Sequence, residues 1–290
     1  MDKKKIVFIA DFFVDQISRG AELANEALLF YLDKDFTIER VKSADLKEVK
    51  KDSYYIISNF VYVAEEIKNK LIEYKNYMIY EHDHKYVATR NPFAVPYGKN
   101  GIEVNTDGIV PKDKLINLEF YKNANVVLCQ TQWHQDQLAR NITANLSNIG
   151  GSLYTPEMLN IVDDVRKKNN KRDTCAIFCG QYKNSEEAII YCKTNNIPFA
   201  LISNVGSPKK FLYILGRHNK FVFFPKIPES CSRLLIEARL LDCKVYTNMN
   251  SGIVNEKCWN FDNDEFRDYI KNTMRTEAID KFRRILNEFR

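Results

Sequence analysis

The sequence lacks an apolar run of the roughly 20 residues that a membrane-spanning helix needs. Its basic N-terminal segment is interrupted by Asp11 and followed by Asp15, which makes it a poor signal peptide. The seven cysteines are odd in number and irregularly spaced, and no Cys-x-x-Cys pair occurs among them, so they do not indicate a disulfide framework. We therefore expect a cytoplasmic protein with no integral membrane segment.

A strong excess of one charge is also missing. The net charge of +5 is spread over both halves of the 290 residues, which suits a small acidic substrate without requiring a polynucleotide partner. Hydrophobic residues make up 45% and charged residues 28%, as in ordinary globular proteins. A chain of this length favours two compact domains over one.

Strand-like and helical patterns alternate along the first half. The run from Lys5 to Ala10 predicts a strand, and a helical pattern begins at Arg19-Gly20-Ala21-Glu22. Further short runs rich in β-branched or aromatic residues occur at 36–41, 54–60, 77–80 and 126–129. This alternation predicts parallel strands joined by crossover helices. Residues 90–111 contain three prolines and three glycines, which predicts a loop-rich insertion.

A second series of the same kind follows a connection that we place between Gly150-Gly151 and the polar run 166–172. It predicts strands at 174–179, 198–202, 221–224 and 244–247, and helices at 185–195, 208–215, 230–241 and 264–290. The predicted fold class is α/β, with two Rossmann-like doubly wound domains facing a central cleft. The expected domains are 1–155 and 156–290, and we expect the last helix to pack back on the first domain.

Two carboxylates mark the most informative segment. A buried strand ends at a proline-bounded loop that contains Glu229, and Glu237 lies eight residues further on. If both were helical, they would be about 12 Å apart along the axis and turned by only about 80°. Carboxylates of this kind bind the paired hydroxyls of ribose or hexose, so the two can hold opposite ends of one elongated ligand.

The Glu-x7-Glu pattern, followed by Ala238 and by the segment from Thr247-Asn248 to Gly252, resembles the donor site of retaining GT-B glycosyltransferases of the glycogen-synthase-like and sucrose-synthase-like group. The resemblance implies that Glu229 contacts the transferred sugar and that Glu237 binds the nucleotide ribose. Amides of Ser230, Cys231 and Ser232 would help to hold the sugar. These three residues stand where the family commonly has Gly-Phe-Gly, and Asp242 and Lys244 replace a common glycine and proline.

Other segments support the resemblance more thinly. Gly20 lies in a segment similar to the family's Gly-Gly-Ala-Glu turn, where a helix N-terminus points into the cleft. Gly180 and Lys183 follow the first strand of the second half, where the family carries cations that neutralise the donor diphosphate. Lys183 is the first candidate for that role and Arg233 the second. Gln181 stands where the family has an arginine.

Two of the four histidines, His82 and His84, follow the strand at 77–80. A His-x-His run also fits a metal site, but such a site needs further ligands, and the cysteines show no spacing that would supply them. In the resembling family a histidine at the end of this strand reaches the reacting sugar. Either histidine is therefore a candidate catalytic residue, and we expect no bound metal.

The expected activity is transfer of a sugar from a nucleoside-diphosphate sugar, such as a UDP-sugar, to an acceptor hydroxyl with retention of configuration and no required cofactor. The acceptor is left open between a glycan, a lipid-linked saccharide and DNA with hydroxymethylated bases, as in phage modification enzymes. A second alternative is a catalytically silent protein that only binds a sugar nucleotide. The departures at Gln181 and at Ser230 to Ser232 favour this alternative, whereas the intact glutamate pair favours an enzyme.

Overall fold

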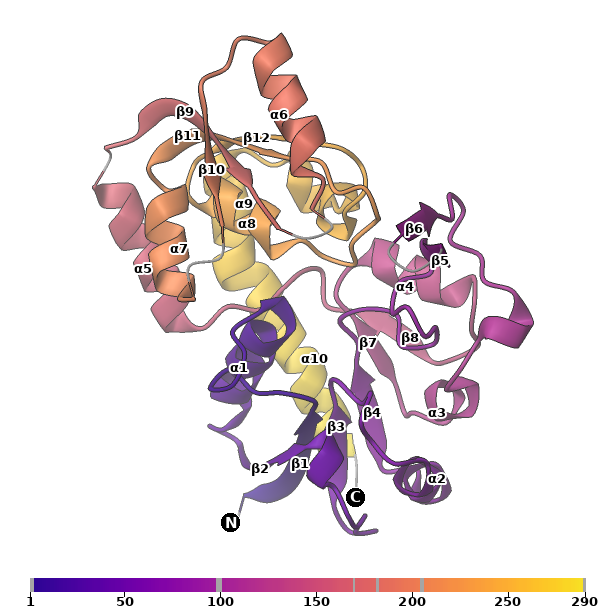
Figure 1. Cartoon of the computed structure of the whole chain (residues 1–290). Helices are drawn as coiled ribbons and strands as arrows, with labels where there is room; N and C mark the ends of the chain where they lie inside the picture. Colours follow the sequence, from indigo (N-terminus) through magenta and orange to yellow (C-terminus); the bar gives the residue numbers. More distant parts are fainter. Residues whose placement is uncertain (1–2, 98–100, 169, 181–182, 204–205, 289–290) are drawn as a thin grey trace. The chain divides into compact units, whose positions relative to one another are not determined.

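The computed structural model describes residues 3–97, 101–168, 170–180, 183–203 and 206–288 (Figure 1). The chain forms two compact units. Unit 1 comprises Met1–Leu153 and Met274–Arg290, and unit 2 comprises Tyr154–Thr273. Within the described residues, no helix is long and apolar enough to cross a membrane.

Unit 1 is built on a six-stranded parallel sheet with the order β2-β1-β3-β4-β7-β8. Its strands are β1 (Lys4–Ala10), β2 (Phe36–Lys42), β3 (Tyr54–Ile57), β4 (Tyr77–Tyr80), β7 (Val127–Cys129) and β8 (Leu146–Asn148). Because the strands are parallel, the residues that follow them all lie at one edge of the sheet, where open α/β sheets bind ligands.

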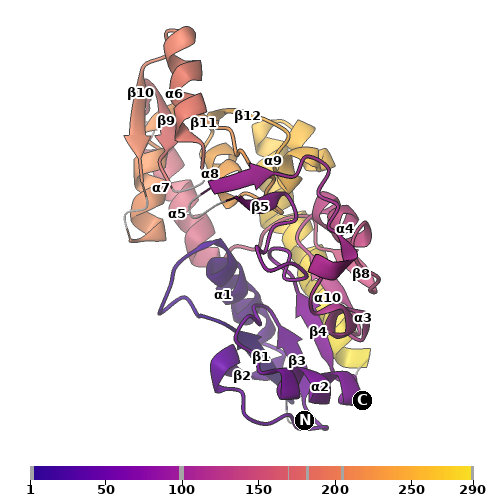
Figure 2. The ribbon, with the colours of Figure 1, turned by 45° about the vertical axis from the view of Figure 1, so that its right-hand side comes forward.

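Helices cover both faces of this sheet, because side chains alternate between the faces along each strand. Ile9, Ile57 and Ile79 point into one hydrophobic cluster with α2 (Glu65–Tyr74) and α3 (Leu118–Lys122). The opposite face is covered by α1 (Gly20–Leu32) and α10 (Arg275–Glu288), which lie side by side (Figure 2). The Tyr80 ring on that face lies edge-on to Phe282 of α10, with the centroids 5.3 Å apart.

The segment 90–111 contains an antiparallel hairpin, β5 (Ala94–Tyr97) and β6 (Gly101–Val104), where the sequence predicted only loops. Its base is fixed to α4 (Gln132–Ala139) by stacking of Phe93 on Trp133, with the centroids 5.8 Å apart. Gly108 has a φ of 65°, and a Cβ there would lie 2.5 Å from the Phe93 ring. Only glycine fits this position, so the insertion has a built base. The helical turns 43–45 and 112–114 complete unit 1.

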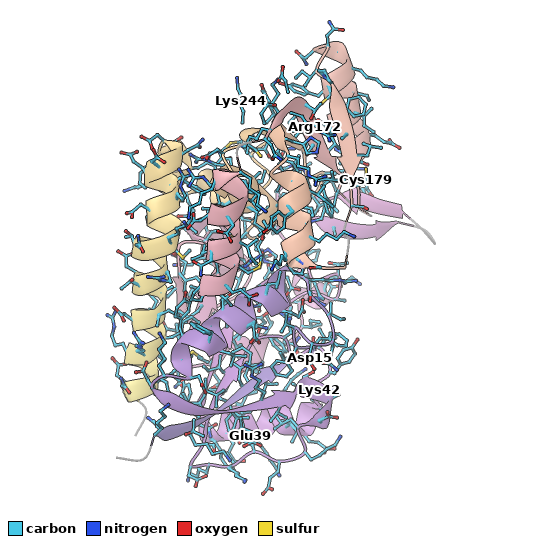
Figure 3. All side chains as sticks on the ribbon, turned by 90° about the vertical axis from the view of Figure 1, so that its left-hand side faces the viewer. Asp15, Glu39, Lys42, Arg172, Cys179 and Lys244 are labelled. Carbon is cyan, nitrogen blue, oxygen red and sulfur yellow. The ribbon has the colours of Figure 1, made fainter. Side chains whose placement is uncertain are left out.

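Unit 2 has a four-stranded parallel sheet with the order β10-β9-β11-β12. Its strands are β9 (Arg172–Phe178), β10 (Phe199–Ile202), β11 (His218–Phe223) and β12 (Lys244–Thr247). Its helices are α5 (Pro156–Lys167), α6 (Ser185–Thr194), α7 (Pro208–Leu215), α8 (Arg233–Leu240) and α9 (Asn263–Asp268), with helical turns at 252–255 and 257–260. In Figure 3, Arg172 marks the start of β9 and Cys179 the residue after its end.

The segment that we predicted to be the interdomain connection contains the helix α5. Thr155 caps it by accepting a hydrogen bond from the Met158 amide at 3.2 Å, and Pro156 occupies the first turn, as is common at helix starts. Val165 of α5 packs so closely on Gly216 that a Cβ there would lie 2.2 Å from its Cγ1. The helix is therefore part of the packing of unit 2 rather than a linker.

After α9 the chain passes through a π-helical turn, Tyr269–Met274, and continues as α10 in unit 1. Both units consist of parallel strands connected by helices. The predicted class of two Rossmann-like α/β domains is confirmed.

Candidate functional site

The ends of β9 and β11 in unit 2 bring together two predicted donor residues. Lys183 follows β9 and Glu229 follows β11, and the Lys183 Nζ forms an ion pair with the Glu229 Oε1. The two side chains are 31% and 23% exposed. The same ammonium lies 5.5 Å from the centre of the Phe223 ring. An ion pair that remains partly in water can exchange partners with a charged ligand at small cost.

Glu229 does not lie on the helix that carries Glu237, which corrects the geometry predicted from the sequence. The helix α8 begins at Arg233, and Glu229 instead bridges to the segment after β12. Its amide donates to the Asn250 carbonyl at 3.1 Å, and its carbonyl accepts from the Gly252 amide at 2.8 Å. The helical separation expected for the two carboxylates therefore does not apply. The backbone of Glu229 is fixed by sheet-like bonds.

Ser230, Cys231 and Ser232 span the four-residue step between Glu229 and α8. Ser232 is the N-cap residue of α8, and its amide donates to the Ser251 hydroxyl at 3.3 Å. Burial raises the pKa of the Cys231 thiol, which keeps it protonated near neutral pH. Gly180 precedes two residues, 181 and 182, that lie outside the described part of the chain, so the position of Gln181 is not described. Ser230, Cys231 and Ser232 therefore lead into α8 without contributing a reactive side chain.

Glu237 is held inside unit 2 by Arg233. The Arg233 Nε lies 3.3 Å from the Glu237 Oε1, and each side chain is 7% exposed. The Arg233 guanidinium also lies 3.9 Å from the centre of the Tyr154 ring. Burial raises the pKa of Glu237, while the charge of Arg233 acts in the opposite direction. Of the two cations predicted at the donor diphosphate, Lys183 is thus partly exposed and Arg233 is buried with a carboxylate.

Lys226 is a cation near this site that the sequence analysis missed. It is exposed, follows β11, and lines a small cavity of about 270 Å³ with Asn184, Ser185 and Glu186 at the start of α6. Helix N-termini attract anions. The sequence signal that could have identified Lys226 is its position two residues before Pro228-Glu229.

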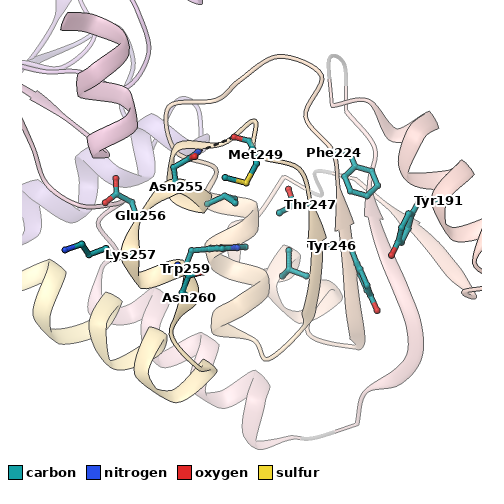
Figure 4. Close-up of a pocket in the computed structure, with 12 residues that line it drawn as sticks. Tyr191, Phe224, Tyr246, Thr247, Met249, Asn255, Glu256, Lys257, Trp259 and Asn260 are labelled. Carbon is teal, nitrogen blue, oxygen red and sulfur yellow. Dashed lines mark hydrogen bonds between the residues drawn. The ribbon is translucent and has the colours of Figure 1, made fainter. Parts of the chain in front are cut away.

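A larger pocket of about 690 Å³ lies along β12 and contains none of the predicted donor residues (Figure 4). Tyr191, Phe224 and Tyr246 lie together, and Trp259 lines it from the helical turn 257–260. The lining of this pocket therefore does not include the ion pairs of Glu229 and Glu237.

In unit 1, His82 lies in a polar cluster at the carboxyl edge of the sheet. Its Nε2 lies 2.8 Å from the Asn25 Oδ1, which also accepts a hydrogen bond of 2.8 Å from the Ser58 hydroxyl. With the amide oxygen as the acceptor, the His82 Nε2 carries the hydrogen. Gly20 is the first residue of α1, which is the element that follows β1 in the chain. Asn25 was not identified from the sequence, because nothing in its local pattern distinguishes it.

The residues that flank His82 in the chain form a buried ionic network at the carboxyl edge of the sheet. Glu81 accepts hydrogen bonds from Lys85 at 2.5 Å and from the Tyr121 hydroxyl, and Lys85 also contacts Asp83 at 2.6 Å. The Glu81 and Lys85 side chains are 0% and 2% exposed. Burial raises the pKa of Glu81 to about 7, although Lys85 acts to lower it. Arg90 adds a further ion pair with Asp83, so the loop after β4 is tied down from several sides.

His84 belongs to different surroundings from His82. It is 1% exposed, and its ring lies edge-on to the rings of His134 and Tyr86, with centroids 4.7 and 5.5 Å away. Burial lowers the pKa of His84 well below its usual range. Of the two histidines, His82 is therefore the candidate catalytic residue. Within the described residues, no group of three His, Cys, Asp or Glu side chains is arranged to hold a metal ion.

No protein-family model and no curated protein matches this chain. Solved structures share its fold, among them Anabaena HepE in complex with UDP and glucose, with a TM-score of 0.52 and 11% identity over 95% of this chain and 92% of that one. The trehalose-6-phosphate synthase OtsA gives a TM-score of 0.55 and 8% identity over 98% and 95%. A UDP-forming α,α-trehalose-phosphate synthase from Burkholderia xenovorans, in complex with glucose-6-phosphate, gives 0.50 and 7% over 93% and 84%. The chain therefore has the fold of the two-domain GT-B glycosyltransferases.

Proposed function

We propose that the protein is a glycosyltransferase that moves a sugar from a nucleoside-diphosphate sugar, most simply a UDP-sugar, to an acceptor hydroxyl with retention of configuration. The observation that carries this proposal is the partly exposed ion pair of Lys183 and Glu229 at the strand ends of a GT-B fold. HepE, which shares the fold, has been crystallised with UDP-glucose. In this proposal unit 2 binds the donor and unit 1 binds the acceptor.

The ion pair gives the donor site its chemistry. A donor diphosphate takes the place of Glu229 beside Lys183, since the pair is partly exposed and one ionic contact replaces another. The ammonium then stabilises the negative charge that grows on the departing diphosphate. The released Glu229 carboxylate accepts hydrogen bonds from hydroxyls of the transferred sugar. Lys226 offers a second cation for the same diphosphate, in a small cavity that Glu186 also lines.

Glu237 binds the ribose hydroxyls in this proposal. Its carboxylate is buried beside Arg233, and its oxygens accept hydrogen bonds from the hydroxyls. His82 is the candidate catalytic residue of unit 1; its Nε2–H is donated to Asn25, so it acts through the rest of its ring. The departing diphosphate itself removes the acceptor proton, so the reaction requires neither a dedicated base nor a metal.

The decisive experiment measures free UDP after incubation with UDP-glucose, UDP-galactose and UDP-N-acetylglucosamine. We expect UDP release, a lower affinity for UDP in Glu237→Ala by calorimetry, and a larger loss of turnover than of UDP affinity in Glu229→Ala. Glu277→Ala is the matched control, because Glu277 is an exposed glutamate of α10. Equal UDP affinity and unchanged turnover in both site variants contradict the assigned roles.

The configuration of the product decides retention, because the NMR coupling constant at the anomeric carbon distinguishes the two outcomes. Tight UDP binding without UDP release from any donor identifies the silent binding protein instead. Its basis in the sequence is the replacement of the family's Gly-Phe-Gly by Ser230, Cys231 and Ser232.

A further inference from the structure

An aromatic pair with one exposed and one partly buried ring lies at the carboxyl edge of the unit 1 sheet. Phe12 follows β1 and Tyr62 follows β3, and these two strands are neighbours. Their rings are edge-on, with centroids 6.2 Å apart. Tyr62 is 57% exposed, and Val61 beside it is 48% exposed. Water-exposed aromatic and aliphatic surface at a strand-end edge is a feature of binding surfaces.

Asp11 fixes the backbone beneath this pair. Its carboxylate is 6% exposed and accepts hydrogen bonds from the Ser43 hydroxyl at 2.5 Å, the Val61 amide at 3.3 Å and the Tyr62 amide at 3.4 Å. A buried carboxylate that accepts several hydrogen bonds is a strong constraint on the groups that donate them. The exposed Tyr62 ring is therefore carried by a backbone that Asp11 holds in place.

Buried polar atoms of the same edge have no hydrogen-bond partner within the described part of the chain. They are the Glu22 Oε2, the Asn25 Nδ2 and the Asn59 Oδ1, on side chains of residues that are 7%, 1% and 3% exposed. Asn25 is also the residue that binds His82 and Ser58, and Asn59 directly follows Ser58. Such atoms are costly to leave unpaired, so a bound ligand that pairs with them gains that free energy.

The three atoms comprise two acceptors and one donor. A sugar hydroxyl can both donate and accept, so a group of hydroxyls on one ring can satisfy all three. A phosphodiester, as in DNA, offers only acceptors and would meet the Glu22 carboxylate with charge repulsion. The donor and acceptor inventory therefore matches a polyhydroxylated ring better than an anion.

Two of the cations near this edge are already paired with carboxylates. Arg90 forms an ion pair with Asp83, and it also lies within electrostatic reach of Asp11 and Glu22. Lys85 is paired with Glu81 and Asp83 inside the unit. A DNA backbone is bound through cations that neutralise its phosphates. Arg90 and Lys85 are therefore held by carboxylates and are not available to a polyanion, whereas Arg19, the N-cap residue of α1, is exposed.

We propose that this edge is the acceptor site and that the acceptor is a neutral saccharide. The apolar face of the sugar ring lies on Tyr62 and Phe12, and its hydroxyls bind Glu22, Asn25 and Asn59 next to His82. This inference rests on the proposed glycosyltransferase function and selects, among its open acceptors, a saccharide over hydroxymethylated DNA. A free and a lipid-linked saccharide present the same ring to the site.

The experiment compares the unsubstituted protein with Tyr62→Ala and Glu22→Gln. The control is Phe30→Ala, since Phe30 is a 44% exposed aromatic residue near the other end of the helix that carries Glu22. The probes are the methyl glycosides of glucose, galactose, mannose and N-acetylglucosamine, n-octyl glucoside, and a duplex with 5-hydroxymethylcytosine. We expect Tyr62→Ala to raise the acceptor KM about tenfold, because it removes the stacking surface, with a smaller effect on kcat.

Saturation-transfer NMR of the glycosides tests the same site without a donor. We expect contacts from the sugar ring to aromatic protons, and we expect them to weaken in Tyr62→Ala and to persist in Phe30→Ala. A preference for n-octyl glucoside over the methyl glycosides identifies a lipid-linked source of the saccharide. Failure of the proposed function appears separately, as a lack of UDP binding and release with every donor.

The inference is overturned by UDP release together with transfer to the duplex and to no glycoside. It is also overturned if Tyr62→Ala and Glu22→Gln leave both the acceptor KM and the saturation transfer unchanged.

Discussion

The ion pairs at the strand ends of the two units differ in how deeply they are buried. In unit 1, Glu81 and Lys85 are almost fully buried and are held further by Tyr121 and Asp83. In unit 2, Lys183 and Glu229 are both partly exposed. A buried pair is expensive to open, because each charge would be left without water or partner, whereas a partly exposed pair opens at little cost. The buried network therefore fixes the loop after β4, whereas the exposed pair can open.

The largest expected effect tests this contrast directly. Lys85→Met leaves the buried Glu81 without its cation, and we expect unit 1 to lose about 3–5 kcal/mol of unfolding free energy. Lys183→Met removes the cation of the exposed pair, and we expect a loss of about 0–1 kcal/mol in unit 2. Urea unfolding of each variant supplies both values.

The two tryptophans make the measurement specific for each unit. Trp133 lies in unit 1 and Trp259 in unit 2, so Trp259→Phe leaves fluorescence that reports unit 1, and Trp133→Phe leaves fluorescence that reports unit 2. A similar small loss for both lysine variants would mean that Glu81 takes up a proton at no cost, and the contrast between the units would disappear.

A second effect depends on pH. Burial lowers the pKa of His134 from 6.5 to about 4, so the native state favours the neutral ring. A lowered pKa gives stability that is fully present above pH 6.5 and is lost as the pH falls toward 4. We expect His134 to account for a loss of about 3 kcal/mol in unit 1 over this window. The Trp133 signal during urea unfolding at a series of pH values measures it.

The variant His134→Gln is the control for this slope. We expect it to be less stable than the unsubstituted protein at pH 7, and the difference between the two to shrink as the pH falls toward 4. A difference that stays constant with pH would show that His134 does not titrate in this window.

The smallest expected effect compares matched helix caps. Thr131 caps α4 in unit 1 by accepting from the His134 amide at 3.1 Å, and Thr155 caps α5 in unit 2 by accepting from the Met158 amide at 3.2 Å. We expect Thr131→Ala and Thr155→Ala each to cost about 1 kcal/mol, since each leaves a helix amide without its partner. Each loss should appear in the tryptophan signal of its own unit. A loss from Thr155→Ala that appears only in the Trp133 signal would contradict the assignment of α5 to unit 2.

Several elements were predictable to the residue. The strands Tyr77–Tyr80 and Lys244–Thr247 and the helix Pro208–Leu215 have the predicted bounds. In each, the signal is local: apolar or aromatic runs for the strands, and Ser207-Pro208 at the start of the helix. The Ser207 side chain caps that helix, as such a start predicts. Alternation of these elements was also enough for the α/β class.

The start of α8 and the helix α5 were predicted incorrectly for different reasons. The sequence placed Glu229 in a loop, where it lies, but began the helix at 230 instead of Arg233; backbone bonds of Glu229 to Asn250 and Gly252 hold the chain in an extended form just before that start. Those partners are distant in the sequence, and local patterns do not contain them. The helix α5 did have local signals, namely Thr155-Pro156 at its start and the helical spacing of Leu159, Val162 and Val165. The neighbouring glycines and charged residues were instead interpreted as a linker.

The sequence by itself determined the alternating parallel architecture and the residue types available for sugar and phosphate chemistry, because propensity and hydrophobic periodicity act over a few neighbouring residues. Only the tertiary structure decided which of those residues meet. It paired Lys183 with Glu229 and Arg233 with Glu237, and it separated His82 from His84. It also placed Asn25 and Glu81 where they organise the unit 1 edge. The physical reason is that burial and charge pairing are set by elements that are distant in the sequence and adjacent in the fold.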